Sequence, residues 1–237
     1  MTAGHGVLYD GCVAHRGKFI TFEGLDGCGK STQVEKLAAV LRDRGLSVVV
    51  TREPGGTPAA EKIRQLLLDT KTAGLAPMAE LALMFAARAQ HIQEVIAPAL
   101  SEGKIVVCDR FTDSTEAYQG GGRKIGTEPV LELQRILCGN FWPDLTILMD
   151  SDATMSIARA RRRNQARGKK RSAEHDENRF EQESLAFFGR VRQAYLAIAR
   201  REPERVVIAD ARGTPDKTHD KILEVVRSRL RFAVKGA

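Results

Sequence analysis

The chain has 237 residues, 43% of them hydrophobic, and a formal net charge of +7. This length and apolar content suit one large domain or two small ones. The positive charge is concentrated, because eight of the thirteen residues from Arg159 to Arg171 are basic and none is acidic. Outside this stretch, 29 basic residues stand against 30 acidic ones. So local a charge argues against a protein that coats nucleic acid or a membrane surface.

The cysteines and apolar runs indicate a reduced, cytoplasmic chain. The four cysteines form no CxxC pair and no zinc-binding spacing; they are Cys12, Cys28, Cys108 and Cys138. No apolar run approaches the about 18 residues that a membrane span needs. Residues 1–17 lack the apolar region of a signal peptide, and we expect a poorly ordered extension there. A single domain is then predicted over residues 18–237.

Short apolar, β-branched runs alternate with segments of helical periodicity along the chain. Strands are predicted over residues 18–22, 46–50, 104–108, 145–149 and 205–209. Several of them are apolar without alternation, as in strands covered on both faces. Apolar spacing near 3.6 predicts a helix from Val34 to Leu41, a long helix over about 77–100 and a helix start at Thr127. This order predicts an α/β fold with a five-stranded parallel sheet and helices on both faces.

The strongest motif, GLDGCGKST, follows the first predicted strand and opens a helix. It fits the phosphate-binding P-loop pattern, whose glycines let backbone N–H groups converge on phosphate oxygens at a helix N-terminus. Lys30 adds a full charge near the β- and γ-phosphates, and Ser31 can ligate Mg²⁺. The candidate ATP-binding residues are Gly24, Leu25, Asp26, Gly27, Cys28, Gly29, Lys30, Ser31 and Thr32. This motif predicts a P-loop nucleotide-binding fold.

Cys28 lies inside this loop, close to the helix start. A helix N-terminus can lower a thiol pKa, and ATP would then shield the thiol from alkylation. The alternative, which we favour, is a small residue that fills a tight turn.

Three further clusters point to an acceptor site. TREPGGT (51–57) and DRFTDSTEAYQGGGR (109–123) follow the second and third predicted strands, and MFAAR (84–88) lies on the long helix. In an open parallel sheet, ligands bind beyond the carboxyl ends of the strands, so these loops and the P-loop share one crevice. The chain lacks the N-K-x-D motif of GTPase switches. A kinase that acts on a small acceptor is therefore the leading class.

Taken together and in this order, these clusters closely resemble the thymidylate kinase family, nearly throughout from Lys18 onward. The resemblance implies a nucleoside monophosphate kinase fold and transfer of the γ-phosphoryl group of Mg²⁺-ATP to thymidine 5′-monophosphate (dTMP), a step toward dTTP and DNA precursors. It also implies a homodimer. One departure is Phe111, where the family more often has Tyr or His, and we expect this change to tune packing.

The resemblance assigns roles to single residues of the acceptor site. Arg52 and Arg110 resemble the arginines that bind the acceptor phosphate, for which planar guanidinium groups are well suited. Phe85 resembles the aromatic side chain that stacks on thymine, and Arg88, on the same helix face, resembles the base-reading arginine. Alone, Phe85 would rather be a core residue and Arg88 a solvated charge.

The remaining roles concern the sugar, the metal and the lower-priority acceptor contacts. Asp26 resembles the acid that contacts the deoxyribose 3′-hydroxyl, and Tyr118 the ring that packs where a 2′-hydroxyl would lie. Asp109 resembles the acid that helps place Mg²⁺ and the P-loop lysine. Thr115 and Gln119 are further acceptor-site candidates.

The basic stretch is interpreted as a lid over about 159–178. The P-loop holds no arginine, so positive charge for the transferring phosphoryl group must come from elsewhere. The lid-type pattern of the family reads R-x-R-x-R beyond the strand-end Asp150, and Arg163 is our first candidate for the transition-state arginine. Its reserves are Arg159, Arg161 and Arg179. The tip over 164–177 is longer and more basic than the usual lid and is given no role.

Two other functions stay open. Another nucleoside monophosphate or deoxynucleoside kinase could use the same scaffold. A nucleic-acid-binding P-loop protein could use the basic stretch, and each phosphate contact would then add a slope of about −0.9 to the dependence of log affinity on log salt. The stretch has no interleaved aromatic residues, which argues against base stacking. We therefore expect ATP and dTMP as partners, and neither nucleic acid nor membrane.

Overall fold

The computed structural model of the chain describes residues 17–72, 74–168, 179–180 and 183–230, and over 163–168 it describes the backbone alone. Most of the predicted N-terminal extension and the end of the predicted lid, residues 1–16 and 169–178, lie outside the described residues. Gly17 was expected in the extension, yet its N–H donates to the carbonyl of Leu100 over 3.0 Å.

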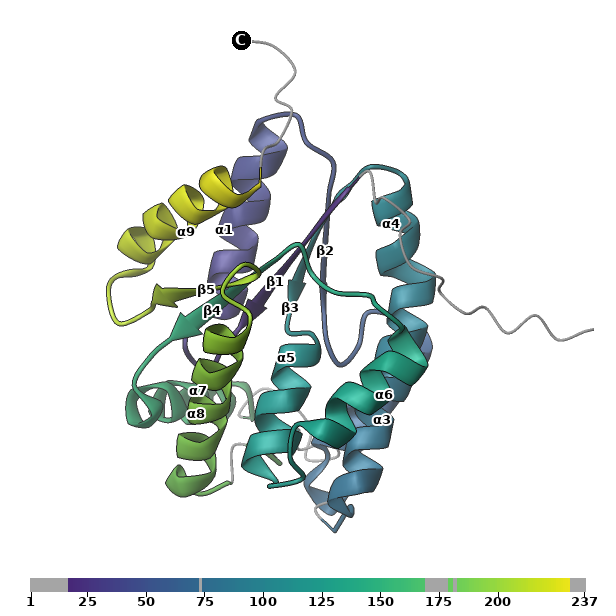
Figure 1. Ribbon diagram of the computed structural model, residues 1–237. Coiled ribbons are helices and arrows are strands. Elements are labelled where there is room, and N and C mark those ends of the chain that lie inside the picture. Colours follow the sequence, from purple (N-terminus) through teal and green to yellow (C-terminus); the bar gives the residue numbers. More distant parts are fainter. Residues whose placement is uncertain (1–16, 73, 169–178, 181–182, 231–237) are drawn as a thin grey trace, which may run out of the picture.

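The described residues form one five-stranded parallel sheet with the order β2-β3-β1-β4-β5 (Figure 1). Its strands are β1 (Lys18–Glu23), β2 (Val48–Arg52), β3 (Ile105–Asp109), β4 (Leu145–Asp150) and β5 (Val206–Asp210). The predicted fold class is confirmed, and four of the strands begin within one residue of the prediction. The second begins and ends two residues later, because pairing with β3 continues through Thr51 and Arg52, and Arg52 lies opposite Asp109.

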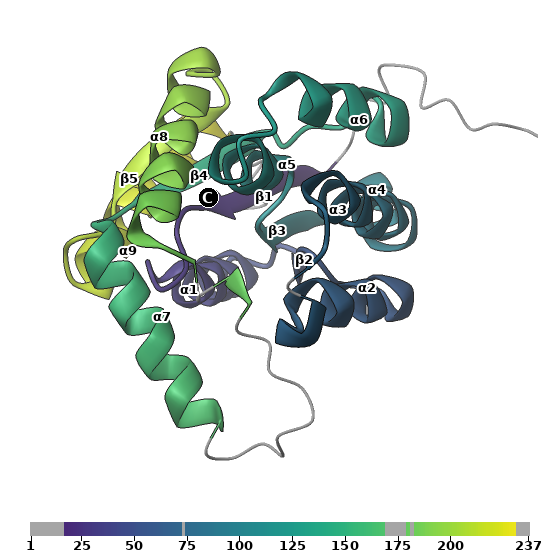
Figure 2. The same cartoon turned by 90° about the horizontal axis from the view of Figure 1, so that it is seen from below.

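Helices cover both faces of the sheet (Figures 1 and 2). One face carries α1 (Lys30–Asp43) and α9 (Pro215–Arg229), and the other carries α3 (Pro77–His91), α4 (Ala97–Ser101), α6 (Glu128–Cys138) and α8 (Leu185–Arg201). The described chain also contains α2 (Pro58–Leu68), the short helix η1 (Thr70–Thr72), α5 (Thr112–Thr115) and α7 (Ala153–Gly168).

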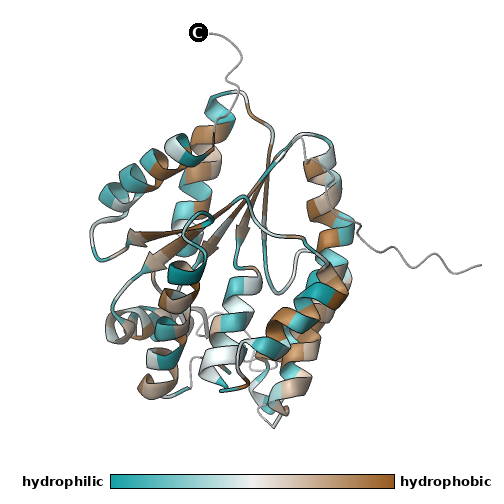
Figure 3. Ribbon diagram, viewed as in Figure 1, coloured by the Kyte–Doolittle hydropathy of each residue, from teal (hydrophilic) through white to brown (hydrophobic). Residues whose placement is uncertain are grey.

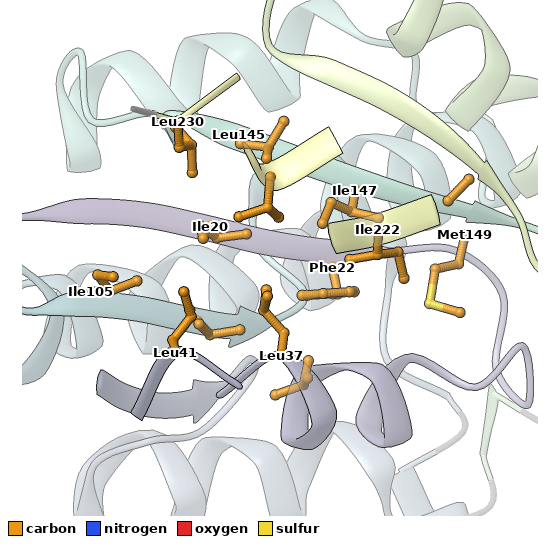
Figure 4. Close-up of a cluster of buried hydrophobic side chains, with 14 of the residues drawn as sticks. Ile20, Phe22, Leu37, Leu41, Ile105, Leu145, Ile147, Met149, Ile222 and Leu230 are labelled. Carbon is orange, nitrogen blue, oxygen red and sulfur yellow. The ribbon is translucent and has the colours of Figure 1, made fainter. Parts of the chain in front are cut away.

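Apolar strands separate two buried layers. The hydropathy colouring shows the strands as a brown band between mostly amphipathic helices (Figure 3). Under α1 and α9, Ile20 and Phe22 of β1 pack against Leu37 of α1 and Ile222 of α9, all with at most 1% exposure (Figure 4). Fully burying such a side chain contributes about 1.5–3 kcal/mol, so this layer holds the strands firmly in place. The residues at the carboxyl ends of the strands therefore have fixed positions.

Two π-helical segments interrupt the helices near the crevice. The helix predicted over 77–100 is continuous in outline, but a π turn, η2 (Ile92–Ile96), joins α3 to α4. Pro98 explains the turn, since proline has no N–H and its ring clashes with the carbonyl four residues earlier in an α-helix. A second π segment, η3 (Glu116–Gly122), continues α5 and carries Tyr118 and Gln119.

The η3 segment lies very close to α8. A Cβ atom added at Gly121 would be 2.6 Å from the Cβ of Ala194 in α8. Only glycine allows this approach, which brings α8 side chains to the site.

We expect Gly121→Ala to lower the free energy of unfolding by about 1–3 kcal/mol, because overpacking forces α8 away from η3. Chemical denaturation measures the change. Gly189→Ala, in α8 but with open space around the added Cβ, is the matched control and should be neutral or stabilising. Adding Ala194→Gly to Gly121→Ala should restore stability. If it does not, the close approach is not what makes Gly121 necessary.

Candidate functional site

The P-loop connects β1 to α1 and is shaped by close backbone packing. At Gly27, with φ +81°, an added Cβ would lie 2.1 Å from the carbonyl oxygen of Ser156 in α7. Lys30 is 6% exposed, and its ammonium group donates to the carbonyls of Gly24 (3.1 Å) and Leu25 (2.9 Å). It therefore lies inside the loop, with its charge directed to where phosphate oxygens would bind.

Cys28 is a packing residue of this loop. It is 3% exposed, and burial raises the pKa of its thiol even though the charge of Lys30 acts in the opposite direction. A buried thiol with a raised pKa is poorly nucleophilic. The interpretation as a small residue that fills a tight turn is therefore favoured over ATP-shielded reactivity.

Ser31 and Asp109 meet at the start of α1. The Ser31 hydroxyl donates to Asp109 Oδ2 over 2.7 Å, so the first turn of α1 contacts the last residue of β3. Mg²⁺ takes oxygen ligands and keeps several waters, so a hydroxyl and a carboxylate beside a phosphate site fit such an ion. Among the described residues, no cluster of three or more His, Cys, Asp or Glu side chains offers a complete protein metal site.

Arg110 joins the acceptor clusters to the P-loop. Its guanidinium group donates to Asp26 Oδ1 (2.8 Å), Ser114 Oγ (2.9 Å) and the hydroxyls of Tyr118 and Tyr195 (3.1 Å each). Its backbone φ is +76°, a conformation that costs a residue other than glycine about 1–3 kcal/mol. The backbone N–H that follows, from Phe111, is held by Glu23 (2.7 Å).

Electrostatics keep this cluster charged. Burial would raise the pKa of Asp26, but the charges of Arg110 and Lys30 hold that pKa well below its usual value. Burial would likewise lower the pKa of Arg110, but the Asp26 carboxylate raises it well above its usual range. The Tyr118 hydroxyl also donates to Asp26 Oδ2 over 2.9 Å. Asp26, Arg110 and Tyr118, three of the residues predicted from the sequence, are thus brought together.

Arg88 is a buried cation, at 2% exposure, on α3. This helix carries the predicted base-binding residues Phe85 and Arg88 and is called the acceptor wall. Nε donates to Glu53 Oε2 (2.7 Å) and Nη2 to Thr115 Oγ1 (2.8 Å), whereas Nη1 has no hydrogen-bond partner among the described residues. The guanidinium carbon lies 4.8 Å from the ring centroid of Phe85 and 5.1 Å from that of Phe111. Phe85 itself has no exposed surface, so its role as a base platform stays a prediction. Phe111 packs on Arg88, in line with the packing role expected for it.

Two other predicted acceptor residues have acidic partners. Arg52 is exposed and pairs with Glu61 in α2 at 3.0 Å. Gln119 is buried and donates to Glu80 Oε1 over 2.8 Å.

The lid candidates fall into two groups. Arg159 and Arg161 lie on α7 and are exposed, and the side chain of Arg163 lies outside the described residues. Arg179 differs from the expectation for a reserve transition-state residue. It is 5% exposed and forms an ion pair with the fully buried Glu80 at 2.6 Å, and it donates to the carbonyl of Leu67. A cation held in this way anchors the segment after the predicted lid.

Sequence reasoning did not assign Glu23 and Tyr195. The Glu23 carboxylate is fully buried and accepts from Tyr195 (3.0 Å), Ser114 and the Phe111 N–H. Burial, reinforced by the negative charge of Asp113, raises the pKa of Glu23 to about 7. An acid that ends an apolar strand just before the P-loop was an available signal for Glu23. Tyr195 is 172 residues away and gave none.

The chain matches the family model described as thymidylate kinase over residues 22–222. It is 50% identical over 216 residues to the thymidylate kinase of Trichlorobacter lovleyi, which covers 91% of this chain and all of the relative. Identity to the Geobacter sulfurreducens thymidylate kinase is 47% over 214 residues, 90% of this chain and 98% of the relative. A crystal structure of thymidylate kinase from Ehrlichia chaffeensis superposes with a TM-score of 0.70, at 32% identity, over 89% of this chain and 98% of that one.

The raised pKa of Glu23 predicts a pH dependence of stability. Between about pH 4.5 and 7 the folded state holds a proton that the unfolded state has released, so the Glu23 contribution falls as the pH rises through this window. We expect Glu23→Gln to lose less stability than the wild type between pH 5 and 8 in denaturant titrations. Glu35→Gln, at an exposed position of α1, controls for the loss of one carboxylate. Parallel profiles for wild type and Glu23→Gln would contradict the assignment.

Proposed function

The chain belongs to the thymidylate kinase family, and we propose how its residues share the work of phosphorylating dTMP with ATP. The observation that carries the proposal is the ion pair between Arg110 and Asp26, because it holds Arg110, our candidate for binding the acceptor phosphate, against the P-loop. Donor and acceptor phosphates are thereby held next to each other. Phosphoryl transfer needs such positioning and electrostatic stabilisation more than covalent help from the protein.

On the donor side, the P-loop amides, Gly24 to Thr32, and the N-terminus of α1 bind the ATP phosphates. Lys30 exchanges its loop carbonyls for β- and γ-phosphate oxygens. Ser31 and Asp109 would hold Mg²⁺, whose charge would balance that of the phosphates. The 2.7 Å contact between their side chains supports this pair as the protein part of the metal site.

On the acceptor side, Arg52 and Arg110 bind the phosphate of dTMP, and Asp26 contacts the 3′-hydroxyl. The ring of Tyr118 packs against deoxyribose where a ribonucleotide would carry its 2′-hydroxyl. Phe85 and Arg88 serve the base, with Thr115 and Gln119 beside them. Arg88 Nη1 supports this assignment, because a buried N–H without a partner is costly and a carbonyl of thymine would supply the missing acceptor.

The lid arginines neutralise charge on the transferring phosphoryl group, with Arg163 as the first candidate and Arg159 and Arg161 in reserve. Their helix, α7, contacts the P-loop where Gly27 meets Ser156, which supports this placement.

We also propose a cytoplasmic homodimer. Free cysteines fit a reducing compartment; those described are Cys28, Cys108 and Cys138. In the described part of the chain, no helix has the length and apolarity to cross a membrane. Exposed apolar side chains on α6 and α3, Ile136 (57% exposed) and Met78 (53%), offer a surface for a second copy. A monomeric mass in sedimentation velocity would contradict the dimer.

An acceptor panel tests the function. With ATP and Mg²⁺, a coupled ADP-release assay should show rapid turnover with dTMP, and much less with UMP, CMP or thymidine. Preferred turnover of another monophosphate would favour the related-kinase alternative. Tight, strongly salt-dependent binding of DNA at physiological salt, without turnover of any acceptor, would instead favour a nucleic-acid-binding protein.

We expect Arg163→Ala to lower kcat by about 10³-fold or more while the KM for dTMP changes little, because a transition-state arginine acts only once charge develops. Steady-state kinetics measure both constants. Arg162→Ala, an exposed neighbour on α7, is the control and should keep its kcat. Near-wild-type turnover of Arg163→Ala would transfer the role to Arg159 or Arg161.

A further inference from the structure

Behind Arg88 lies a chain of buried and half-buried polar side chains, Glu53, His91 and Thr51, to which the proposed roles assign no function. It runs from Arg88 through Glu53 and His91 to Thr51, and Arg88, Glu53 and His91 are 2%, 4% and 0% exposed. Glu53 Oε2 accepts from Arg88 Nε at 2.7 Å, and Glu53 Oε1 lies 3.0 Å from His91 Nδ1. His91 Nε2 lies 2.6 Å from the Thr51 hydroxyl.

The hydrogen-bond roles in this chain are set by the carboxylate. A carboxylate only accepts, so Glu53 binds N–H groups of both Arg88 and His91. The hydroxyl of Thr51 can donate or accept and satisfies the second ring nitrogen in either case. The imidazole is therefore held at both ends, by the loop that follows β2 and by β2 itself.

Close packing leaves the ring little room to turn. A Cβ atom at Gly56 would lie 2.4 Å from His91 Nε2, so the glycine turn of the TREPGGT segment closes directly over the imidazole. His91 is the last residue of α3 and lies three residues after Arg88, on the same side of the helix. It thus links the loop after β2 to the helix that carries Arg88.

What this chain achieves follows from the geometry of a guanidinium group, which is planar with its N–H bonds in fixed directions. Glu53 fixes Nε, Thr115 fixes Nη2, and the rings of Phe85 and Phe111 lie within 4.8 and 5.1 Å of the guanidinium carbon. The direction of the free Nη1 is then no longer adjustable. A donor with a fixed direction prefers a carbonyl oxygen and disfavours an amino group at the same place.

We propose that Glu53 and His91 are positioning residues that set base specificity, because they hold the free N–H of Arg88 toward a carbonyl of the acceptor base. This inference rests on the proposed base-reading role of Arg88. Neither residue touches the reacting atoms. Without His91, Glu53 still accepts from Arg88 but loses its second hydrogen-bond partner and with it its fixed orientation. The guanidinium group of Arg88 then shifts with Glu53, and Nη1 no longer points in a fixed direction.

The test compares His91→Leu, which removes both ring nitrogens, with His91→Asn, whose amide can still donate to Glu53. For His91→Leu, we expect kcat/KM for dTMP to fall about 10- to 100-fold, since small misplacements of positioning groups reach ~10²-fold effects. The KM for ATP should stay within about twofold. His91→Asn should recover most of the loss.

Two alternative acceptors make the specificity claim measurable. Cytosine carries an amino group where thymine has its 4-carbonyl, so the preference for dTMP over dCMP should shrink in His91→Leu. Uracil keeps both carbonyls and lacks only the methyl group, so the ratio of dTMP to dUMP should not change. Thr51→Val, which removes only the hydroxyl at the far end, should shift the dTMP/dCMP ratio in the same direction by a smaller factor, and it serves if His91→Leu does not fold.

His219→Leu is the control for loss of a buried histidine. His219 is 8% exposed and bonds Gln33 over 3.1 Å, away from the acceptor wall, so its variant should lower the Tm and leave the acceptor ratios unchanged. A lower Tm with an unchanged dTMP/dCMP ratio for His91→Leu and Thr51→Val would overturn the proposal and make the chain purely structural. If Arg88→Lys itself leaves this ratio unchanged, the base-reading role fails and the positioning role fails with it. If the dTMP/dCMP ratio changes in Arg88→Lys but not in His91→Leu or Thr51→Val, the base-reading role stands and the positioning role is rejected.

Discussion

The ion pair between Arg110 and Asp26 is the interaction on which the site depends. It connects the end of β3 to the P-loop and holds a non-glycine residue at a positive φ. The strain is sustained because the guanidinium group also binds Ser114, Tyr118 and Tyr195 from three further elements, α5, η3 and α8. The direction of the Arg110 guanidinium group is therefore fixed before any ligand arrives, which is the preorganisation that its proposed phosphate-binding role requires.

Two buried arginines of the described chain are each paired with a carboxylate, whereas the buried Lys30 donates to loop carbonyls instead. Arg88 has Glu53, and Arg179 has Glu80. Taking a charge out of water costs several kcal/mol, and removing one partner of such a pair typically costs about 3–5 kcal/mol. These pairs are weak evidence for net stability, but they define orientation sharply. In this chain, such a pair orients the N–H groups of the arginine that the carboxylate does not bind, such as Nη1 of Arg88.

The sequence predicted the parts of the fold and site that depend on local pattern. Apolar runs located the strands, and the P-loop motif and the motif at the end of β3 located Lys30, Asp109 and Arg110. The end of β2 was not predicted correctly, because only pairing with β3 extends the strand to Arg52. The contacts of Tyr195 and His91 were also not predicted, because their partners are distant in sequence and come together only once the sheet forms. For His91, the three-residue spacing from Arg88 was a usable signal.

The two proposed acceptor-phosphate arginines differ in how firmly they are held. Arg110 is bound to four side chains, whereas the Arg52 side chain is 56% exposed and, among the described residues, pairs with Glu61, itself 37% exposed. An exposed pair contributes about 0–1 kcal/mol, so a phosphate can replace Glu61 at small cost. Arg110 instead keeps its bond to Asp26 and would bind the phosphate with the N–H groups that its four partners leave unused. Under the proposed roles, recognition is divided between a rigid arginine that would set the position of the phosphate and an adaptable one that would close on it.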